Sequence, residues 1–338
     1  MSLLLVLFLT LHSTILSSYT QTIDCRVNNS LYLCLFGGQL KNVAFDDAKA
    51  VQTIDDIELH LENLSIEWIS EVAFADVSNS SALYLRDNQL PSLAKHFFHP
   101  LDQLTYLDLK DNRISRIEDG AFARLMNLET LLLDGNRLIT FNSGTWRGLS
   151  GLREIYATNN RISLRKGMFR ELRLLETLAL DTNNITEIPV GTFDGLRHLD
   201  LLYLSRNRIY NLIPEIFQGL GELSELDLAE NKIAYLPEET FRFLNNLEKL
   251  WLSGNRLIAI RATDFKGLDG LRKLYLNSNE LESVDMVAFH IFKNATIEPG
   301  FKVNGVRLKN LKSFVGKFRC VDREEWDTPY DCRSILEI

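Results

Sequence analysis

Apolar residues recur along this chain in a fixed frame, L-x-L-x-x-N-x-(L/I), once every 24 residues. The asparagine of the frame falls at Asn88, Asn112, Asn136, Asn160, Asn183, Asn207, Asn231, Asn255 and Asn279. Each step between them is 24 residues except the step from Asn160 to Asn183, which is 23. One further repeat upstream keeps the register with Leu64 in the asparagine position. About ten tandem units, each too short to bury a core alone, predict a stacked repeat architecture.

Each repeat is expected to carry the chain through one coil that stacks on its neighbours. The L-x-L segment alternates, so Leu107 and Leu109 should point inward while the residue between them points outward. Strands of successive coils should pair in parallel, roughly 4.8 Å apart, into one curved sheet. We expect the asparagine amide, buried where the chain leaves the strand, to satisfy backbone groups of its own coil and the next one.

An aromatic residue follows the asparagine position at a nearly constant distance and should fill the convex side of the core. It comes ten residues later in nine repeats and nine residues later at Phe169. The set is Phe74, Phe98, Phe122, Trp146, Phe169, Phe193, Phe217, Phe241, Phe265 and Phe289. Leucines, asparagines and aromatics of the frame are therefore assigned to the scaffold, and function must come from positions that the frame leaves free.

The start of the chain predicts secretion. Residues 3–11 are apolar and are followed by small polar residues, so residues 1–20 are expected to be a signal peptide. That apolar stretch is too short for a membrane span, and no other run of about 20 apolar residues occurs. N-x-S/T sequons for N-glycosylation agree with an extracellular location and begin at Asn28, Asn63, Asn79, Asn184 and Asn294.

Four cysteines flank the repeats in two local pairs. The pairs are Cys25 with Cys34 and Cys320 with Cys332. A solenoid exposes its core and its sheet edge at both ends, so residues 21–55 and 295–338 are expected to be disulfide-containing caps. Because both pairs are local, no cysteine is left for a covalent dimer, although a non-covalent oligomer stays possible.

The 24-residue frame resembles the typical class of extracellular leucine-rich repeat proteins, which includes Toll-type receptor ectodomains, matrix proteoglycans and neuronal adhesion proteins. The resemblance implies an α/β solenoid, a leucine-rich repeat horseshoe with a parallel concave β-sheet, about ten repeats and disulfide-containing caps at both ends. The repeats should cover residues 56–294.

Each cap has only two cysteines, unlike the four-cysteine caps of vertebrate relatives. Leader, short caps and about ten repeats together are similar to the secreted leucine-rich immune proteins of mosquitoes, of the coil-less type. That resemblance implies pathogen recognition and control of complement-like factors. Longer members pair covalently through a double-cysteine motif and a coiled coil, and neither occurs here.

Two residues of each strand should project from the concave face: the one between the two leucines and the one before the first leucine. The positions between the leucines are His60, Tyr84, Asp108, Leu132, Tyr156, Ala179, Tyr203, Asp227, Trp251 and Tyr275. From both columns, the predicted binding face comprises Tyr84, Tyr106, Asp108, Tyr156, Tyr203, Asp227, Trp251 and Tyr275. Exposed aromatics gather at the energetic centres of binding surfaces. The alternative is that tyrosine and tryptophan simply suit strands and cover one another.

Charges along this face divide into an acidic middle and a basic C-terminal end. The acidic residues are Glu154, Glu225 and Asp227, and the basic ones are Lys249, Arg272 and Lys273. Such a division would orient a ligand of opposite polarity, whereas ordinary solvated charges are the competing interpretation.

Other classes of function find little support in the sequence. A formal net charge of −8 argues against a nucleic-acid surface. No hydrolase elbow, zinc-protease, phosphate-loop or dinucleotide motif occurs, and an open arc lacks a closed pocket, so we expect neither an enzyme, a cofactor nor a metal site. We expect a secreted scaffold that binds a protein or glycan ligand in innate immune recognition or as an adaptor. The alternative is an extracellular matrix, adhesion or signalling modulator that binds a protein ligand.

Overall fold

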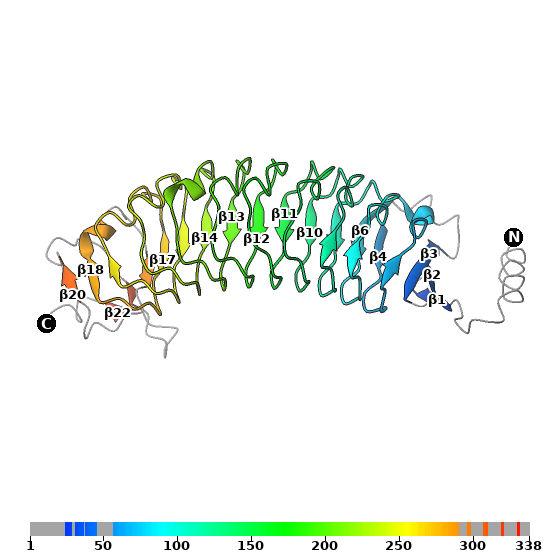
Figure 1. Ribbon diagram of the computed structural model, residues 1–338, viewed down its shortest axis with the longest axis horizontal. Helices are drawn as coiled ribbons and strands as arrows, with labels where there is room; N and C mark the ends of the chain where they lie inside the picture. Colours follow the sequence, from blue (N-terminus) through cyan, green and yellow to red (C-terminus); the bar gives the residue numbers. More distant parts are fainter. Residues whose placement is uncertain are drawn as a thin grey trace, which may run out of the picture.

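The computed structural model shows a shallow arch of stacked coils (Figure 1). The residues that it describes are 24–28, 31–36, 38–45, 57–290, 296–298, 307–309, 319–320 and 330–331. The predicted leader, residues 1–20, lies outside them.

One parallel sheet of eleven strands runs the length of the arch. Its strands are β4 (Ile57–His60), β6 (Ser80–Tyr84), β8 (Tyr106–Asp108), β10 (Thr130–Leu132), β11 (Glu154–Tyr156), β12 (Thr177–Ala179), β13 (Leu201–Tyr203), β14 (Glu225–Asp227), β15 (Lys249–Trp251), β17 (Lys273–Tyr275) and β19 (Thr296–Glu298). From β6 onward each strand pairs with the next without a register shift, so that Leu107 lies beside Leu131 and Leu131 beside Ile155. The predicted solenoid with a parallel sheet of about ten turns is confirmed.

The sheet continues one strand beyond the last frame repeat. β19 pairs in parallel with β17 and lies within residues 295–338, the segment that the sequence assigned to the C-terminal cap. Shorter ladders bridge the coils elsewhere: β7 (Ser92–Leu93) with β9 (Arg116–Ile117), and β16 (Ala259–Ile260) with β18 (Ser283–Asp285) and β20 (Arg307–Lys309). The last described strands, β21 (Arg319–Cys320) and β22 (Tyr330–Asp331), pair antiparallel.

The convex segments contain turns and short 3-10 helices, and no α-helix occurs in the part of the chain that the structure describes. The 3-10 helices are η2 (Ala75–Val77), η3 (Pro214–Phe217) and η4 (Met286–Phe289). The expected α component of the α/β solenoid is therefore absent from these coils. An α-helix with its side chains is about 10 Å wide, whereas adjacent strands lie only about 4.8 Å apart. Turns pack more closely than helices, which agrees with the shallow curvature of the arch (Figure 1).

Each asparagine of the frame ties two coils together. Asn112 accepts a hydrogen bond from the Leu90 N–H at 3.1 Å and donates to the carbonyls of Leu85 and Leu109 at 2.9 and 3.2 Å. The same pattern holds at Asn207, which accepts from the Ile185 N–H at 3.0 Å. The inter-coil partners belong to the preceding coil, so the sequence prediction of bonds to the next coil had the direction wrong. These amides satisfy buried backbone groups that would otherwise be unpaired.

The aromatic column fills the core behind the sheet, as predicted. Every member from Phe74 to Phe289 is at most 3% exposed. Rings of consecutive coils approach closely, with 6.0 Å between the centroids of Phe98 and Phe122 and the same distance between Phe217 and Phe241. Trp146 also donates from its indole N–H to the Met168 carbonyl at 2.8 Å, so its polar atom is satisfied inside the core.

An N-terminal sheet covers the first coil. β1 (Asp24–Asn28), β2 (Leu31–Phe36) and β3 (Gln39–Phe45) are antiparallel, and β3 then pairs in parallel with β5 (Trp68–Ile69) of the first coil. The register sets Cys25 opposite Cys34. At the other end, Cys332 lies outside the described residues. The Cys25–Cys34 and Cys320–Cys332 disulfides both stay predictions.

The sequons fall in different parts of the chain. Asn63, Asn79 and Asn184 are exposed, Asn28 lies in β1, and Asn294 is outside the described residues. Within the described part of the chain, we find no helix with the length and apolar character needed to cross a membrane.

Candidate binding site on the concave face

Three residues of each coil, not two, face the concave side. The strand register aligns the two predicted columns, for example Tyr203 beside Asp227. The alternation continues for one more step past the second leucine, which adds a third column that the sequence reasoning missed. Its members contact one another across coils, because Asp134 forms an ion pair with Lys110 at 3.2 Å and accepts from the Thr158 hydroxyl at 2.8 Å.

The N-terminal end of the face is aromatic. The rings of His60 and Tyr84 stack with 4.4 Å between centroids and 4° between planes. Tyr84 then contacts Tyr106 with 5.2 Å between centroids. Burial raises the pKa of the half-buried Tyr106 phenol, with the nearby Asp108 carboxylate as the next cause. These rings present one continuous apolar surface with polar tips.

A second aromatic pair lies toward the C-terminal end. Trp251 and Tyr275 stack with 5.3 Å between centroids and 2° between planes. Both are half-buried, so part of each ring is covered by its neighbour in the column. The predicted stripe of aromatics is thus present, but it is divided into two clusters and two separate central tyrosines.

The central tyrosines are held by carboxylates. The Tyr156 hydroxyl donates to Glu154 at 3.4 Å, and the Tyr203 hydroxyl donates to Glu225 at 3.2 Å. Burial raises the pKa of both phenols, and the adjacent carboxylates raise it further. Between them β12 contributes the small Ala179, which leaves both rings without an aromatic neighbour in that coil.

Asp108 and Asp227 differ in exposure. Asp108 is only 4% exposed, so the prediction that it forms part of an exposed face is wrong: its carboxylate turns back to accept from the Lys110 N–H at 2.9 Å. Asp227 makes the same local bond to the Ala229 N–H at 2.8 Å but is half-buried. Burial raises its pKa to about 6, with Asp181 and Glu230 adding to the shift.

We define the acidic centre as the five carboxylates in the three columns of β10 to β14. They are Asp134, Glu154, Asp181, Glu225 and Asp227. None of these fifteen column positions, running from Thr130 to Ala229, is lysine or arginine. Burial raises the pKa of the Asp181 carboxyl as well, as it does that of Asp227.

The predicted basic end is largely neutralised. The Lys249 ammonium forms an ion pair with Glu225, and Arg272 forms one with Glu248 at 3.1 Å. Of the three basic residues, only Lys273 makes no ion pair to another described residue. The face therefore offers an acidic centre between two aromatic clusters, and not a simple division of charge along its length.

This arrangement suits recognition of a ligand with a cationic group. Glu154, Asp181 and Asp227 make no ion pair with any described residue, so their charge is available to a partner. Among the described residues, no group of three or more histidine, cysteine, aspartate or glutamate side chains is placed to hold a metal. His198 contacts Glu222 at 3.0 Å outside the sheet.

Comparisons with known proteins agree with this fold. The chain resembles TLR13 in the crystal structure of a TLR13–ssRNA13 complex, with 26% identity and a TM-score of 0.64 over 68% of this chain and 34% of that one. It also resembles a leucine-rich repeat protein of Leptospira interrogans, with 22% identity and a TM-score of 0.53 over 75% of this chain and 65% of that one. The chain thus spans about a third of the length of the TLR13 chain.

No curated protein matches the sequence. A family model does: that of the leucine rich repeat matches residues 58–114, 102–162, 163–209, 197–257 and 245–294. Together these segments cover residues 58–294 without a gap, which is well over half of the chain. The chain belongs to the leucine-rich repeat family.

Proposed function

We propose that this chain is a secreted protein-binding scaffold of innate immunity, a recognition protein or adaptor, that holds its ligand on the concave face. The observation that carries this is the acidic centre, where Glu154, Asp181 and Asp227 lack cationic partners between two aromatic clusters. Uncompensated, partly desolvated carboxylates cost free energy in the free protein, which a ligand cation would relieve. The ligand class that fits is a protein segment with lysine or arginine.

The immune part of the proposal rests on resemblance. The frame resembles Toll-type ectodomains and the secreted leucine-rich immune proteins of mosquitoes, and a TLR13 complex is among the similar structures. The leader, the sequons and the two cysteine pairs support secretion. Expression separates this role from that of a matrix, adhesion or signalling modulator. Induction in blood cells or fat body after infection is expected, whereas patterned expression in developing tissue without induction would favour the alternative.

Isosteric neutralisation of the acidic centre tests the binding mode. We would select peptides on the intact protein from a displayed library and compare the triple variant Glu154→Gln, Asp181→Asn and Asp227→Asn with the parent. Selected peptides should be rich in lysine and arginine and should lose at least tenfold in affinity for the variant. Binding should also weaken as the pH falls through about 6, because Asp227 then becomes neutral.

A matched control changes three exposed carboxyls outside the sheet, Glu171→Gln, Asp194→Asn and Asp269→Asn. It removes the same formal charge and should leave peptide affinity unchanged. Equal losses for the two triple variants would mean that net charge alone governs binding, and peptides without basic residues would contradict the cationic ligand. Selective retention of neutral glycans in place of peptides would also overturn the proposal.

A further inference from the structure

A column of basic side chains follows the asparagine ladder along one flank of the solenoid. The residue directly after each frame asparagine is Arg113, Arg137, Arg161, Asn184, Arg208, Lys232 and Arg256 over seven consecutive coils. Six of the seven are cations, and we call these six the basic ladder. Gln89 precedes it and Glu280 follows it in the same position.

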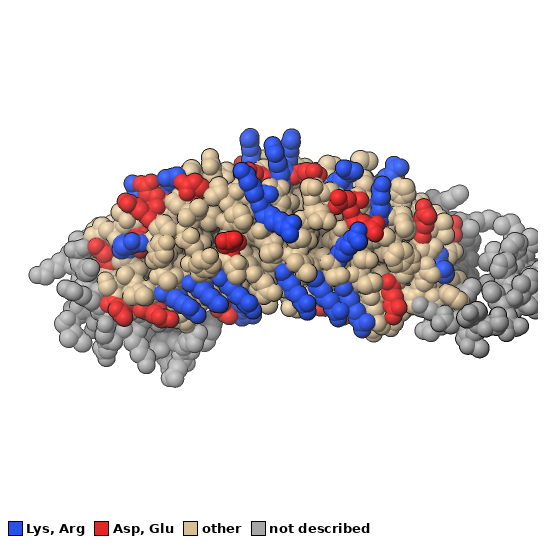
Figure 2. Space-filling view, viewed as in Figure 1, with Lys and Arg blue, Asp and Glu red and all other residues tan. Residues whose placement is uncertain are grey.

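Backbone hydrogen bonds hold the basic ladder in register. The Arg137 N–H donates to the Ile114 carbonyl at 2.9 Å, and the Lys232 N–H donates to the Ile209 carbonyl at 2.8 Å. Every other member makes the equivalent bond to the coil before it. Adjacent coils lie roughly 4.8 Å apart at the sheet, so seven positions span about 29 Å. Figure 2 shows two groups of basic side chains along the lower edge of the arch with a gap between them.

All six cations are exposed, and none makes an ion pair or a side-chain hydrogen bond with another described residue. Elsewhere on the molecule, Arg86, Arg153, Arg206 and Arg242 each pair with a glutamate. A row of unpaired like charges repels itself, which is unexpected in a chain with a net charge of −8. The row is therefore a candidate surface for an anion that spans several coils.

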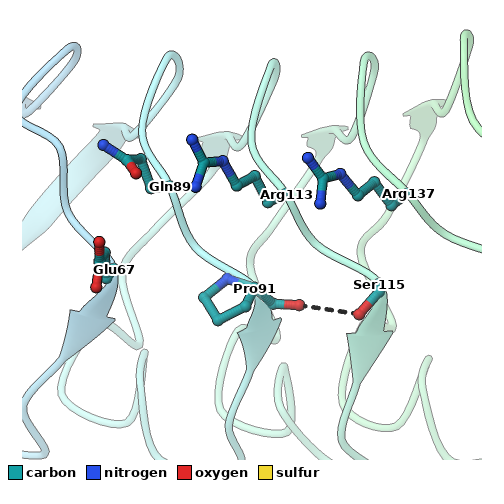
Figure 3. Close-up of a pocket in the computed structure, with 6 residues that line it drawn as sticks. All are labelled: Glu67, Gln89, Pro91, Arg113, Ser115 and Arg137. Carbon is teal, nitrogen blue, oxygen red and sulfur yellow. Dashed lines mark hydrogen bonds between the residues drawn. The ribbon is translucent and has the colours of Figure 1, made fainter.

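The N-terminal half of the ladder borders an open groove of about 320 Å³. Figure 3 shows Gln89, Arg113 and Arg137 side by side along the groove, with Pro91 and Ser115 opposite them. The carboxylate of Glu67 also lines the groove, at the Gln89 end and before the first arginine of the ladder. The Ser115 hydroxyl already donates to the Pro91 carbonyl at 3.2 Å. Guanidinium groups in such a row can each contact sulfate or phosphate through two N–H groups.

We propose that the basic ladder binds a linear sulfated glycan laid across the coils, a surface distinct from the concave site. A single-stranded nucleic acid is less well matched, because such ligands need aromatic platforms for their bases beside the basic groove. Two positions after the ladder residue, the column reads Ser115, Ile139 and Ser163 in the first half. Among the residues whose exposure the structure describes, the exposed tyrosines are Tyr210 and Tyr235, which lie beside the second half. A sulfated chain requires no such platform at each step.

Binding to a size-defined heparin oligosaccharide, long enough to span about 29 Å, tests the proposal on the intact protein carrying Asn184→Gln, because a glycan at that sequon would lie in the gap of the ladder. The logarithm of the affinity should fall linearly with the logarithm of salt concentration, with a slope of about 4 for six contacts, if each contributes ~0.7 as in single-stranded nucleic acid. The triple variant Arg113→Gln, Arg137→Gln and Arg161→Gln should reduce the slope to about 2 and weaken binding at least tenfold at low salt.

The matched control is Arg147→Gln, Arg170→Gln and Arg197→Gln, three exposed arginines without ion pairs that lie outside the ladder. It removes the same charge and should leave both affinity and slope unchanged. Equal loss in the two triple variants would overturn the proposal, since binding would then follow net charge. Unchanged binding after desulfation of the oligosaccharide would overturn it too. So would displacement by single-stranded RNA of equal charge at equal or lower concentration.

A gain-of-function variant guards against loss through misfolding. Asn184 lies in the gap of the ladder, exposed and directly after the frame asparagine Asn183, and it begins a sequon. Asn184→Arg should complete a seven-cation row and tighten oligosaccharide binding several-fold relative to Asn184→Gln, which removes the sequon alone. Equal affinities of these two variants would contradict a ligand that runs along the ladder.

Discussion

Replacing Asp227 with asparagine should stabilise the fold at neutral pH while it weakens ligand binding. Burial raises the pKa of the Asp227 carboxyl to about 6, and the neighbouring Asp181 and Glu230 charges add to this. At neutral pH the folded protein therefore holds the Asp227 carboxylate in an environment that favours the neutral acid. Asparagine has nearly the same shape, and its side-chain oxygen can still accept from the Ala229 N–H, now 2.8 Å from the carboxylate.

The magnitude follows from the shift in pKa. Moving from 3.8 to about 6 corresponds to roughly 3 kcal/mol at about 1.36 kcal/mol per unit. Asp227 is half-buried, and solvent screening reduces this to about 1–2 kcal/mol. Because the native pKa lies above the unfolded one, the native state binds more protons between about pH 4 and 6, and stability falls as the pH rises through that window. The destabilisation caused by the ionised Asp227 is therefore absent in acid and fully present above about pH 6.

Urea unfolding of the parent and Asp227→Asn at two pH values measures this cost. The variant should be more stable by about 1–2 kcal/mol at about pH 7.5, and the two proteins should be equal within error at about pH 3.5. The exposed Asp194→Asn serves as the control and should leave stability unchanged at both pH values. An equal gain at both pH values would show that packing, not charge, is responsible, and destabilisation at pH 7.5 would refute the electrostatic reasoning.

Three further predictions concern the scaffold. Phe217→Ala should cost about 3–5 kcal/mol in unfolding free energy, because it leaves a cavity in a fully buried column, and a smaller loss in urea titration would mean that the coils relax. Asn207→Ala should cost roughly 2–4 kcal/mol, because the Ile185 N–H and two carbonyls lose a buried partner; an unchanged midpoint would mean that water replaces the amide. Replacing Cys25 and Cys34 together with serine should cost about 2–3 kcal/mol if they form the predicted disulfide, and an equal midpoint before and after reduction of the parent would argue against that bond.

The sequence predicted the scaffold because every coil packs the same residue types against the same positions of its neighbours. A leucine at Leu107 or an asparagine at Asn112 is in a fixed relation to the next coil, so period and residue type were sufficient. The frame does not specify the backbone of the convex segments, and turns fit the strand spacing better than helices do, which is why the expected α component did not appear. The pattern also could not predict which neighbouring coil the asparagine amides bind, because the coils before and after both offer backbone N–H and C=O groups at the same spacing.

The concave face was predicted less completely. Alternation correctly placed Tyr203 and Asp227 in the same column, but the prediction included one column too few and missed Asp134 and Asp181. Burial depends on the neighbours in the column and not on the frame, and Asp108 became buried beside Tyr84 and Tyr106 for that reason. Aromatic stacking and the pairing of Lys249 with Glu225 likewise arise only when coils are stacked in register.

Net charge is a poor guide to ligands in a solenoid, and this chain shows why. The frame fixes the direction of each position, so the side chains at one position form a column whose charge is independent of the rest. Here the concave columns of β10 to β14 are acidic, while the position after the frame asparagine is basic in six of the seven coils from Asn112 to Asn255. The formal charge of −8 averages these surfaces and conceals the second. It therefore does not exclude a polyanion on the flank, and separate neutralisation of each column should change one binding activity and leave the other intact.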